Sequence, residues 1–137
     1  MGRLVYLDNA ATTKTSPEVV KAMLPYFSES YGNPSSIYTI GSEAKTAVET
    51  AREEIAASIG AQPEEIYFTA GGSEADNWAI KMTAQMLSDK GRHIITSAIE
   101  HHAVLHTCEY LEKKGFEVTY IGVDEDGVIK LDELERA

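Results

Sequence analysis

The sequence predicts an α/β fold in which a mostly parallel sheet is flanked by helices. Short apolar segments with the pattern of strands alternate with longer segments that have the pattern of helices, and glycine or proline stands at most of the boundaries. Strands separated by helices of this length are typical of βαβ units, whose strands pair in parallel. With 137 residues, 43% of them hydrophobic and 25% charged, the composition is that of a globular domain with a buried core.

The first part of the chain predicts one extended segment and two helices. Residues 3–8 (RLVYLD) have the pattern of a short strand. Ser16 and Pro17 fit the cap and first turn of a helix, which we expect to end before YGNPSS at residues 31–36. The second helix is indicated by apolar residues spaced by three or four positions and by a terminal glycine. These residues are Ala44, Val48, Ala51, Ile55, Ile59 and Gly60.

The second part predicts three strands, each close to a helix. We expect strands at residues 65–69, 93–97 and 117–123, helices at 73–90 and about 101–114, a turn at 124–127 and a short helix from 131. A helix of about two turns is marginal in isolation. We therefore expect the chain to be the front part of a longer protein.

Composition and charge argue against several classes of partner. The chain has 22 acidic and 12 basic residues, and its formal charge of -10 opposes binding to nucleic acid and to anionic membranes. Its apolar runs are much shorter than the roughly 20 residues that span a bilayer. The single cysteine, Cys108, has no partner for an internal disulfide. We expect a cytoplasmic protein that contacts neither nucleic acid nor membrane.

The stretch FTAGGSEADN, residues 68–77, joins a predicted strand to a predicted helix. Glycine at 71 and 72 lets backbone N–H groups approach an anion, and Ser73 adds a hydroxyl at the positive end of the helix dipole. The same residues fit an ordinary helix start, with Ser73 as the N-cap of a capping box. The local pattern leaves both interpretations open, because the turn lacks the spacing of a P-loop or a Rossmann fingerprint.

A second cluster, SAIEHHAVLH at residues 97–106, also follows a predicted strand and opens a helix. If the strands are parallel, His101 lies at the same sheet edge as Ser73, where an imidazole can stack on a planar ligand or move a proton. His102 and His106 are four residues apart and could supply half of a metal site. Two histidines alone do not define a metal site, so we expect both on the helix surface and expect no bound metal. Cys108 falls on the apolar stripe and is expected in the core.

Together these segments resemble the cysteine desulfurases of the NifS/IscS type, within the class V aminotransferase group of fold type I pyridoxal-phosphate (PLP) enzymes. The matching segments follow the family's order over almost the whole chain. They are YLDNAATT (6–13), YGNPSS (31–36) with Gly41, AREEIAASIGA (51–61), FTAGGSEADNWAIK (68–81), HIITSAIEHHAVLHTCEYLEKKGFEVTYI (93–121) and GVIKLDELE (127–135).

The resemblance implies the three-layer large domain of fold type I, incomplete in this chain. Residues 1–137 would hold an N-terminal segment and the front part of the PLP-binding domain. The remainder of that domain and a C-terminal small domain would be absent. The resemblance also implies a homodimer, L-cysteine as substrate, and a sulfur-acceptor protein. It leaves open whether the sulfur serves iron–sulfur cluster assembly, tRNA thiolation or another route.

The resemblance further implies cofactor-binding residues. The family's Gly-Ala-Thr-Glu turn, which holds the PLP phosphate, aligns with residues 71–74, so Gly72 and Ser73 would bind that phosphate. His101 aligns with the histidine that stacks on the pyridine ring. Tyr38 departs from the histidine that many relatives carry shortly after the Gly-Asn-Pro motif, which puts that histidine's role in doubt here. Asn33 and Pro34 would lie near the active site and the dimer interface.

No certain catalytic residue is expected within these 137 residues. By resemblance, the Schiff-base lysine and the nucleophilic loop cysteine lie beyond Ala137, and Lys81, Lys90 and Lys130 are no substitutes. The segment alone is therefore expected to be inactive. A selenocysteine lyase, an aminotransferase of the same group, or a short non-catalytic binding or regulatory module are the alternatives. A downstream loop cysteine would distinguish a desulfurase from the other enzymes of the group.

Overall fold

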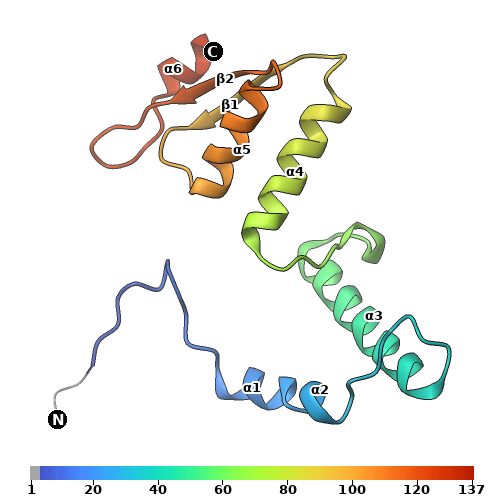
Figure 1. The fold of residues 1–137 in the computed structure, drawn as a ribbon. Helices are drawn as coiled ribbons and strands as arrows, with labels where there is room; N and C mark the ends of the chain where they lie inside the picture. The colour runs from blue at the N-terminus through green and yellow to red at the C-terminus, as the bar shows by residue number, and fades with distance from the viewer. Residues whose placement is uncertain (1–3) are drawn as a thin grey trace. The chain divides into compact units, whose positions relative to one another are not determined.

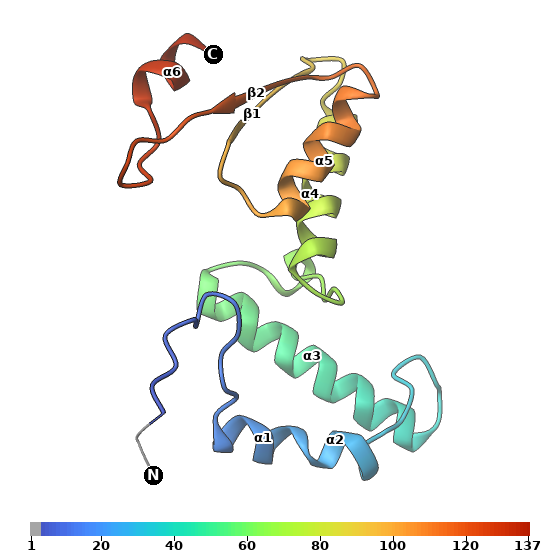
Figure 2. The same cartoon turned by 60° about the vertical axis from the view of Figure 1, so that its left-hand side comes forward.

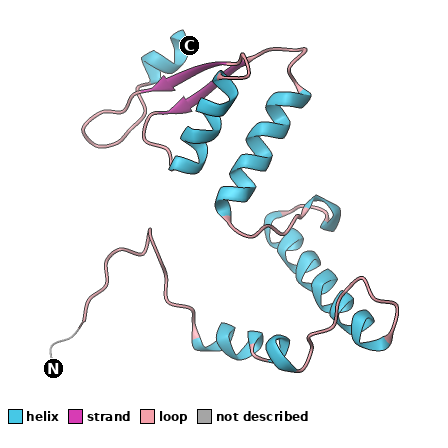
Figure 3. Ribbon diagram, viewed as in Figure 1, coloured by secondary structure: helices cyan, strands magenta, loops and turns pink. Residues whose placement is uncertain are grey.

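The computed structural model describes residues 4–137, which divide into two compact units at residues 4–67 and 68–137 (Figure 1). The first unit is helical. The second contains helices and a two-stranded parallel sheet (Figure 3). Among the described residues, no helix combines the length and the apolar character needed to cross a membrane.

The first unit starts with two short helices where the sequence predicted one. Helix α1 (Pro17–Met23) is capped by Ser16, whose hydroxyl oxygen accepts a hydrogen bond from the Val19 N–H at 3.3 Å. Helix α2 (Pro25–Ser28) follows after one residue. The prediction of a continuous helix was wrong because Pro25 has no N–H to donate to the preceding turn.

Helix α3 (Thr39–Ile59) confirms the second predicted helix and its end. Gly60 adopts a left-handed conformation (φ 71°) and its N–H donates to carbonyl oxygens of the last turn. Gly41, near the start of α3, is buried against the YGNPSS turn, and a Cβ atom there would lie 2.5 Å from the carbonyl oxygen of Ser36. The spacing between YGNPSS and Gly41 therefore reflects a close packing contact.

Two predicted strands do not form. Residues 4–8 have no strand partner among the described residues, and residue 3 of the predicted segment lies outside them. The prediction at 65–69 was also wrong, since Pro63–Glu65 is a short 3₁₀ helix (η1) and residues 66–69 are not in a strand of the described chain. Phe68 is 52% exposed. An apolar run becomes a strand only when a neighbouring strand accepts its backbone hydrogen bonds.

In the second unit, helix α4 (Gly72–Met86) leads to strand β1 (His93–Ser97), and helix α5 (His102–Glu112) connects β1 to strand β2 (Glu117–Ile121). The strands are parallel, with His93 opposite Glu117 and Ser97 opposite Ile121. The predicted βαβ unit is confirmed. Strand β2 is shorter than predicted because Val123 forms an antiparallel bridge with Ile129 across the predicted turn at 124–127.

The core of the second unit lies between α5 and the sheet. Cys108, Leu111 and Ile121 are 1–4% exposed. Thr107, the residue before Cys108 on α5, is also buried. The prediction that Cys108 belongs to the apolar core is confirmed. Helices α4 and α5 run side by side in the same direction (Figures 1 and 2).

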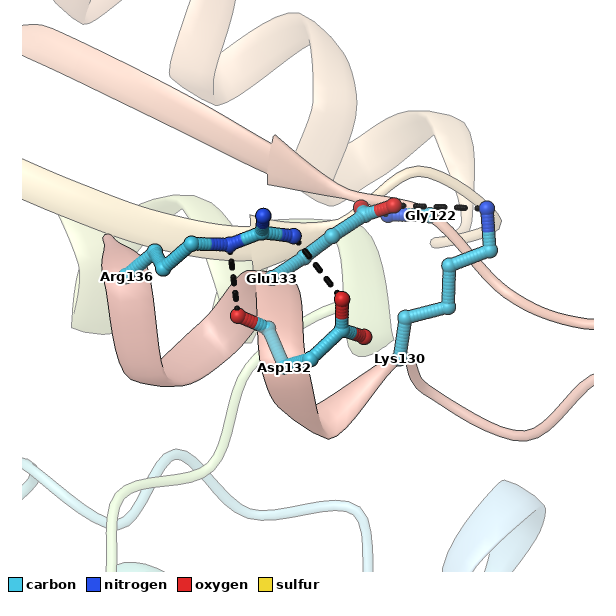
Figure 4. Close-up of polar contacts among 5 residues, drawn as sticks. All are labelled: Gly122, Lys130, Asp132, Glu133 and Arg136. Atoms are coloured by element: carbon cyan, nitrogen blue, oxygen red, sulfur yellow. Dashed lines mark hydrogen bonds and ion pairs between the residues drawn. The ribbon is translucent and has the colours of Figure 1, made fainter.

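Helix α6 (Leu131–Arg136) is held to the end of β2 by polar contacts (Figure 4). The Gly122 N–H donates to Glu133 Oε2 at 2.9 Å, and Lys130 Nζ lies 3.3 Å from Glu133 Oε1. Arg136 pairs with Asp132 at 2.8 Å within the helix. The hydrogen bond from Gly122, followed by that from Lys130, lowers the pKa of Glu133 below its usual value of 4.5.

We expect the contact between α6 and Gly122 to weaken in acid. A carboxyl group whose pKa is depressed in the folded state stabilises that state above its unfolded pKa, here 4.5, and this contribution is lost as the pH falls through the lower folded pKa. The measurement is the Gly122 amide chemical shift followed by NMR from neutral pH downward. It should titrate below pH 4.5 in the wild type and in the control Glu135→Gln. A Gly122 titration that persists unchanged in Glu133→Gln would contradict this assignment.

Candidate cofactor-binding site

The turn before α4 presents unpaired donors at the start of a 15-residue helix. The N-cap is Gly71, in extended backbone conformation, and Glu74 reaches back so that its Oε2 accepts the Ala70 N–H at 2.6 Å. Of the two interpretations that the sequence left open for Ser73, the one in which it is the N-cap is therefore wrong. The helix begins at Gly72 because Gly71 takes the cap position, which leaves the Ser73 hydroxyl free of a capping role.

This turn has four hydrogen-bond donors that are not paired within the described residues. The N–H groups of Gly71, Gly72 and Ser73 and the Ser73 hydroxyl have no acceptor among the residues that the structure describes. A Cβ atom added to Gly71 or Gly72 would meet nothing within 4 Å, so the approach to these N–H groups is open. Unpaired N–H groups at the positive end of a helix form a site for an anion such as a phosphate.

Asn77 ties this turn to the neighbouring helix. Its side-chain amide donates to the Ser73 carbonyl oxygen at 2.8 Å and to the Ala103 carbonyl oxygen of α5 at 3.5 Å. Its Oδ1 accepts a hydrogen bond from Lys81 Nζ at 2.6 Å. Asn77 is a residue of this site that was not predicted from the sequence. The sequence feature that could have identified it is a polar amide four residues after Ser73, on the same face of the helix.

His101 is the N-cap residue of α5, and its ring orientation is set by that role. The Nδ1 atom accepts the Ala103 N–H at 3.1 Å, so a neutral ring carries its proton on Nε2. The preceding loop is fixed by a 3.0 Å hydrogen bond from the buried Ser97 hydroxyl to Glu100 Oε1. The ring of His101 is exposed and available to a ligand.

The parallel course of α4 and α5 brings the two N-terminal ends together. Asn77 contacts Ala103 near the start of both helices, and Lys81 contacts Tyr110 further along both. Figures 1 and 2 show the turn before α4 and the start of α5 at the same end of the helix pair. An anion site and an exposed imidazole at one end suit a ligand that joins a phosphate to a planar ring, so the residues present fit PLP.

His102 and His106 lie on the exposed surface of α5, as expected from the sequence. Their rings stack with centroids 5.3 Å apart and an interplanar angle of 20°. Within residues 4–137, no group of three or more His, Cys, Asp or Glu side chains is arranged to hold a metal ion.

Cys108 has the opposite environment from a reactive thiol. Burial, followed by the nearby Glu112 and Glu100 carboxylates, raises the pKa of this thiol above its usual value of 9.0. A nucleophilic cysteine needs the thiolate form near neutral pH. Cys108 is therefore a structural residue of α5.

Unpaired N–H groups at the start of α4 and an exposed histidine at the start of α5 are compatible with binding of a cofactor that carries a phosphate. The chain belongs to the class-V aminotransferase family, since the family model described as "Aminotransferase class-V" matches residues 5–137. Over 98% of its length the chain is 59% identical to cysteine desulfurase IscS of Methanosarcina thermophila, of which it covers 33%. It is 56% identical over its full length to cysteine desulfurase IscS of Dictyoglomus turgidum, of which it covers 35%.

Solved structures give the same result. A NifS-like protein superposes with a TM-score of 0.87 at 45% identity, over 93% of this chain and 35% of that one. The structure titled "SspA in complex with cysteine" has a TM-score of 0.83 at 43% identity, over 93% of this chain and 37% of that one. The predicted fold class, the large domain of PLP-dependent transferases of fold type I, is confirmed. The chain spans about a third of the length of these relatives.

Proposed function

We propose that this chain is the N-terminal portion of a PLP-dependent cysteine desulfurase. The enzyme would convert L-cysteine to L-alanine and transfer the sulfur to one of its own cysteines as a persulfide. The observation that supports this most strongly is the position of the Gly71–Ser73 donors and of His101 at the same end of the helix pair α4 and α5. The reaction itself is proposed from the relatives of this chain, which are named cysteine desulfurases.

Three residues of the chain would hold the cofactor. The N–H groups of Gly72 and Ser73 and the Ser73 hydroxyl would bind the PLP phosphate, and the His101 ring would stack on the pyridine. PLP, when bound, supplies the electron sink for cleavage of bonds at the substrate's α-carbon. Nε2 of His101 would be the atom that exchanges a proton with the substrate, because Nδ1 is occupied by the Ala103 N–H.

The remaining machinery belongs to the part of the proposed enzyme beyond Ala137. A lysine would anchor the cofactor, and a loop cysteine would attack the substrate sulfur. The carbon–sulfur bond of cysteine would break while a sulfur–sulfur bond forms on the enzyme, and a proton would replace sulfur on the β-carbon. We further propose a cytoplasmic homodimer with a separate sulfur-acceptor protein. Residues 1–137 would contribute the N-terminal segment and the front part of its large domain, with Asn33 and Pro34 near the active site and the dimer interface.

The proposal is tested on the full-length, PLP-loaded protein. We expect equimolar alanine and enzyme-bound or released sulfur from L-cysteine, together with the visible absorption of bound PLP. A PLP-loaded sample that forms neither alanine nor sulfide from cysteine would refute the proposal. Turnover of selenocysteine but not of cysteine would assign the protein to the lyase alternative.

Substitution of Ser73 by alanine should weaken PLP binding in the full-length protein by about tenfold or more, because a hydrogen bond to a charged group is removed. The helix start should persist, since Gly71 and not Ser73 is the N-cap. The measurement is PLP affinity by absorbance titration of the apoprotein. Ser58→Ala, which removes a serine hydroxyl at the end of α3, is the control. Equal PLP affinity in Ser73→Ala and Ser58→Ala would remove Ser73 from the phosphate site.

A further inference from the structure

Away from the candidate cofactor site, a pocket of about 560 Å³ lies between the C-terminal parts of α4 and α5. Its lining combines three basic residues, Lys81, Arg92 and Lys114, with the aromatic rings of Tyr110 and Phe116. Neither Asp nor Glu lines it. The volume falls in the range of pockets that hold small organic ligands.

The positive charges of this pocket are not neutralised by carboxylates. Within the described part of the chain, none of the three cations forms a salt bridge. This is unexpected in a protein with 22 acidic and 12 basic residues, where carboxylates are abundant. The basic residues are instead held by neutral partners, so their charge remains available to a ligand.

Those neutral partners fix the positions of the cations around two rings. Lys81 Nζ lies 4.7 Å from the centre of the Tyr110 ring, and Lys114 Nζ lies 5.5 Å from it. The Arg92 guanidinium lies 4.7 Å from the Phe116 ring and donates to the Lys114 carbonyl oxygen at 3.0 Å. Each contact keeps a cation beside a flat apolar surface.

We propose that this pocket binds a small organic anion with a planar or apolar body, such as a ring that carries a phosphate. The cations would bind the anionic group, while Tyr110 and Phe116 would pack against the ring. Gln85 in the pocket wall follows Gly72 by thirteen positions along α4, which corresponds to roughly 20 Å of helix.

The pocket is connected to that turn by side chains. Lys81 donates to Asn77 at 2.6 Å, and Asn77 donates to the Ser73 carbonyl oxygen at 2.8 Å. An anion that draws Lys81 toward the pocket would loosen the first of these hydrogen bonds. The ligand therefore has a direct physical route by which it would influence the Ser73 turn.

The test uses the full-length protein, loaded with PLP and freed of excess cofactor, in calorimetric titrations with AMP, adenosine and inorganic phosphate. We expect saturable binding of AMP that is tighter than that of adenosine or phosphate. Lys114→Met, which keeps the apolar stem but removes the charge, should weaken AMP binding by about tenfold. Lys114→Arg should retain it. Lys113→Met, at an exposed neighbour outside the pocket lining, is the matched control.

Three results would overturn the proposal. The first is AMP binding that does not saturate at millimolar concentration. The second is adenosine that binds as tightly as AMP, because the anion would then contribute nothing. The third is equal weakening by Lys114→Met and Lys113→Met, which would indicate general attraction to surface charge. None of these outcomes depends on turnover of cysteine, so they are separable from failure of the proposed function.

Discussion

Replacement of His101 by asparagine in the full-length protein should lower the rate of alanine formation from cysteine by about 100-fold or more. Asparagine is a good N-cap and can accept the Ala103 N–H in place of Nδ1. It has neither a ring to stack on the cofactor nor a proton equivalent to that on Nε2. The change therefore removes the proposed chemistry of His101 and keeps its structural role. The measurements are alanine formation and the absorption spectrum of bound PLP.

His101→Ala provides the comparison, because it removes both roles. It should lower the rate as His101→Asn does and also cost about 1 kcal/mol of stability through loss of the cap. His102→Ala, at the exposed neighbour, should leave the rate near that of the wild type. If His101→Asn keeps wild-type turnover and an unchanged spectrum, His101 is only a cap and its proposed role in catalysis is wrong.

Substitution of Leu111 by alanine should destabilise the second unit by about 2–5 kcal/mol. Leu111 is 4% exposed on the face of α5 that carries the buried Cys108, so truncation leaves a cavity in addition to the lost apolar burial. The measurement is urea unfolding of the 137-residue chain followed by far-UV circular dichroism.

Leu131→Ala is the control for Leu111→Ala, because Leu131 is 67% exposed. Its effect should stay within about 0.5 kcal/mol. Equal destabilisation by the two substitutions would mean that the core of the second unit does not lie where the structure places it.

The sequence predicted the elements whose stability is local or is shared with a neighbour in the chain. Helix α3 and its Gly60 end follow from apolar spacing and from the left-handed conformation that glycine adopts readily. Strand β1 was predicted at its observed bounds, since it pairs with β2 only one helix away. The core position of Cys108 followed from helical periodicity alone.

The wrong predictions concern features that a local pattern does not determine. Residues 65–69 have the composition of a strand, but a strand also needs a place in a sheet, and the sheet of the described residues contains only β1 and β2. The split between α1 and α2 depends on Pro25, whose missing N–H outweighs the apolar stripe on both sides of it. The helix start at Gly72 is accompanied by a hydrogen bond from the Ala70 N–H to Glu74 Oε2, and the N-cap is Gly71, not Ser73.

For the candidate site, the sequence by itself determined which residues are present and which family they belong to. The resemblance to the family indicated Gly72, Ser73 and His101 as cofactor-binding residues, whereas the local pattern of each segment did not assign that role. The sequence left open whether Ser73 caps the helix or presents its hydroxyl to a ligand.

Only the tertiary structure showed that Ser73 is not the cap and brought the turn and His101 to the same end of the helix pair. Gly71 takes the cap, so the Ser73 hydroxyl stays unpaired among the described residues. The packing of α4 beside α5, with Asn77 bonded to Ala103, places the turn and His101 at one end of the helix pair. The physical reason is that capping and anion binding use the same N–H groups, and only the folded backbone determines which acceptor reaches them.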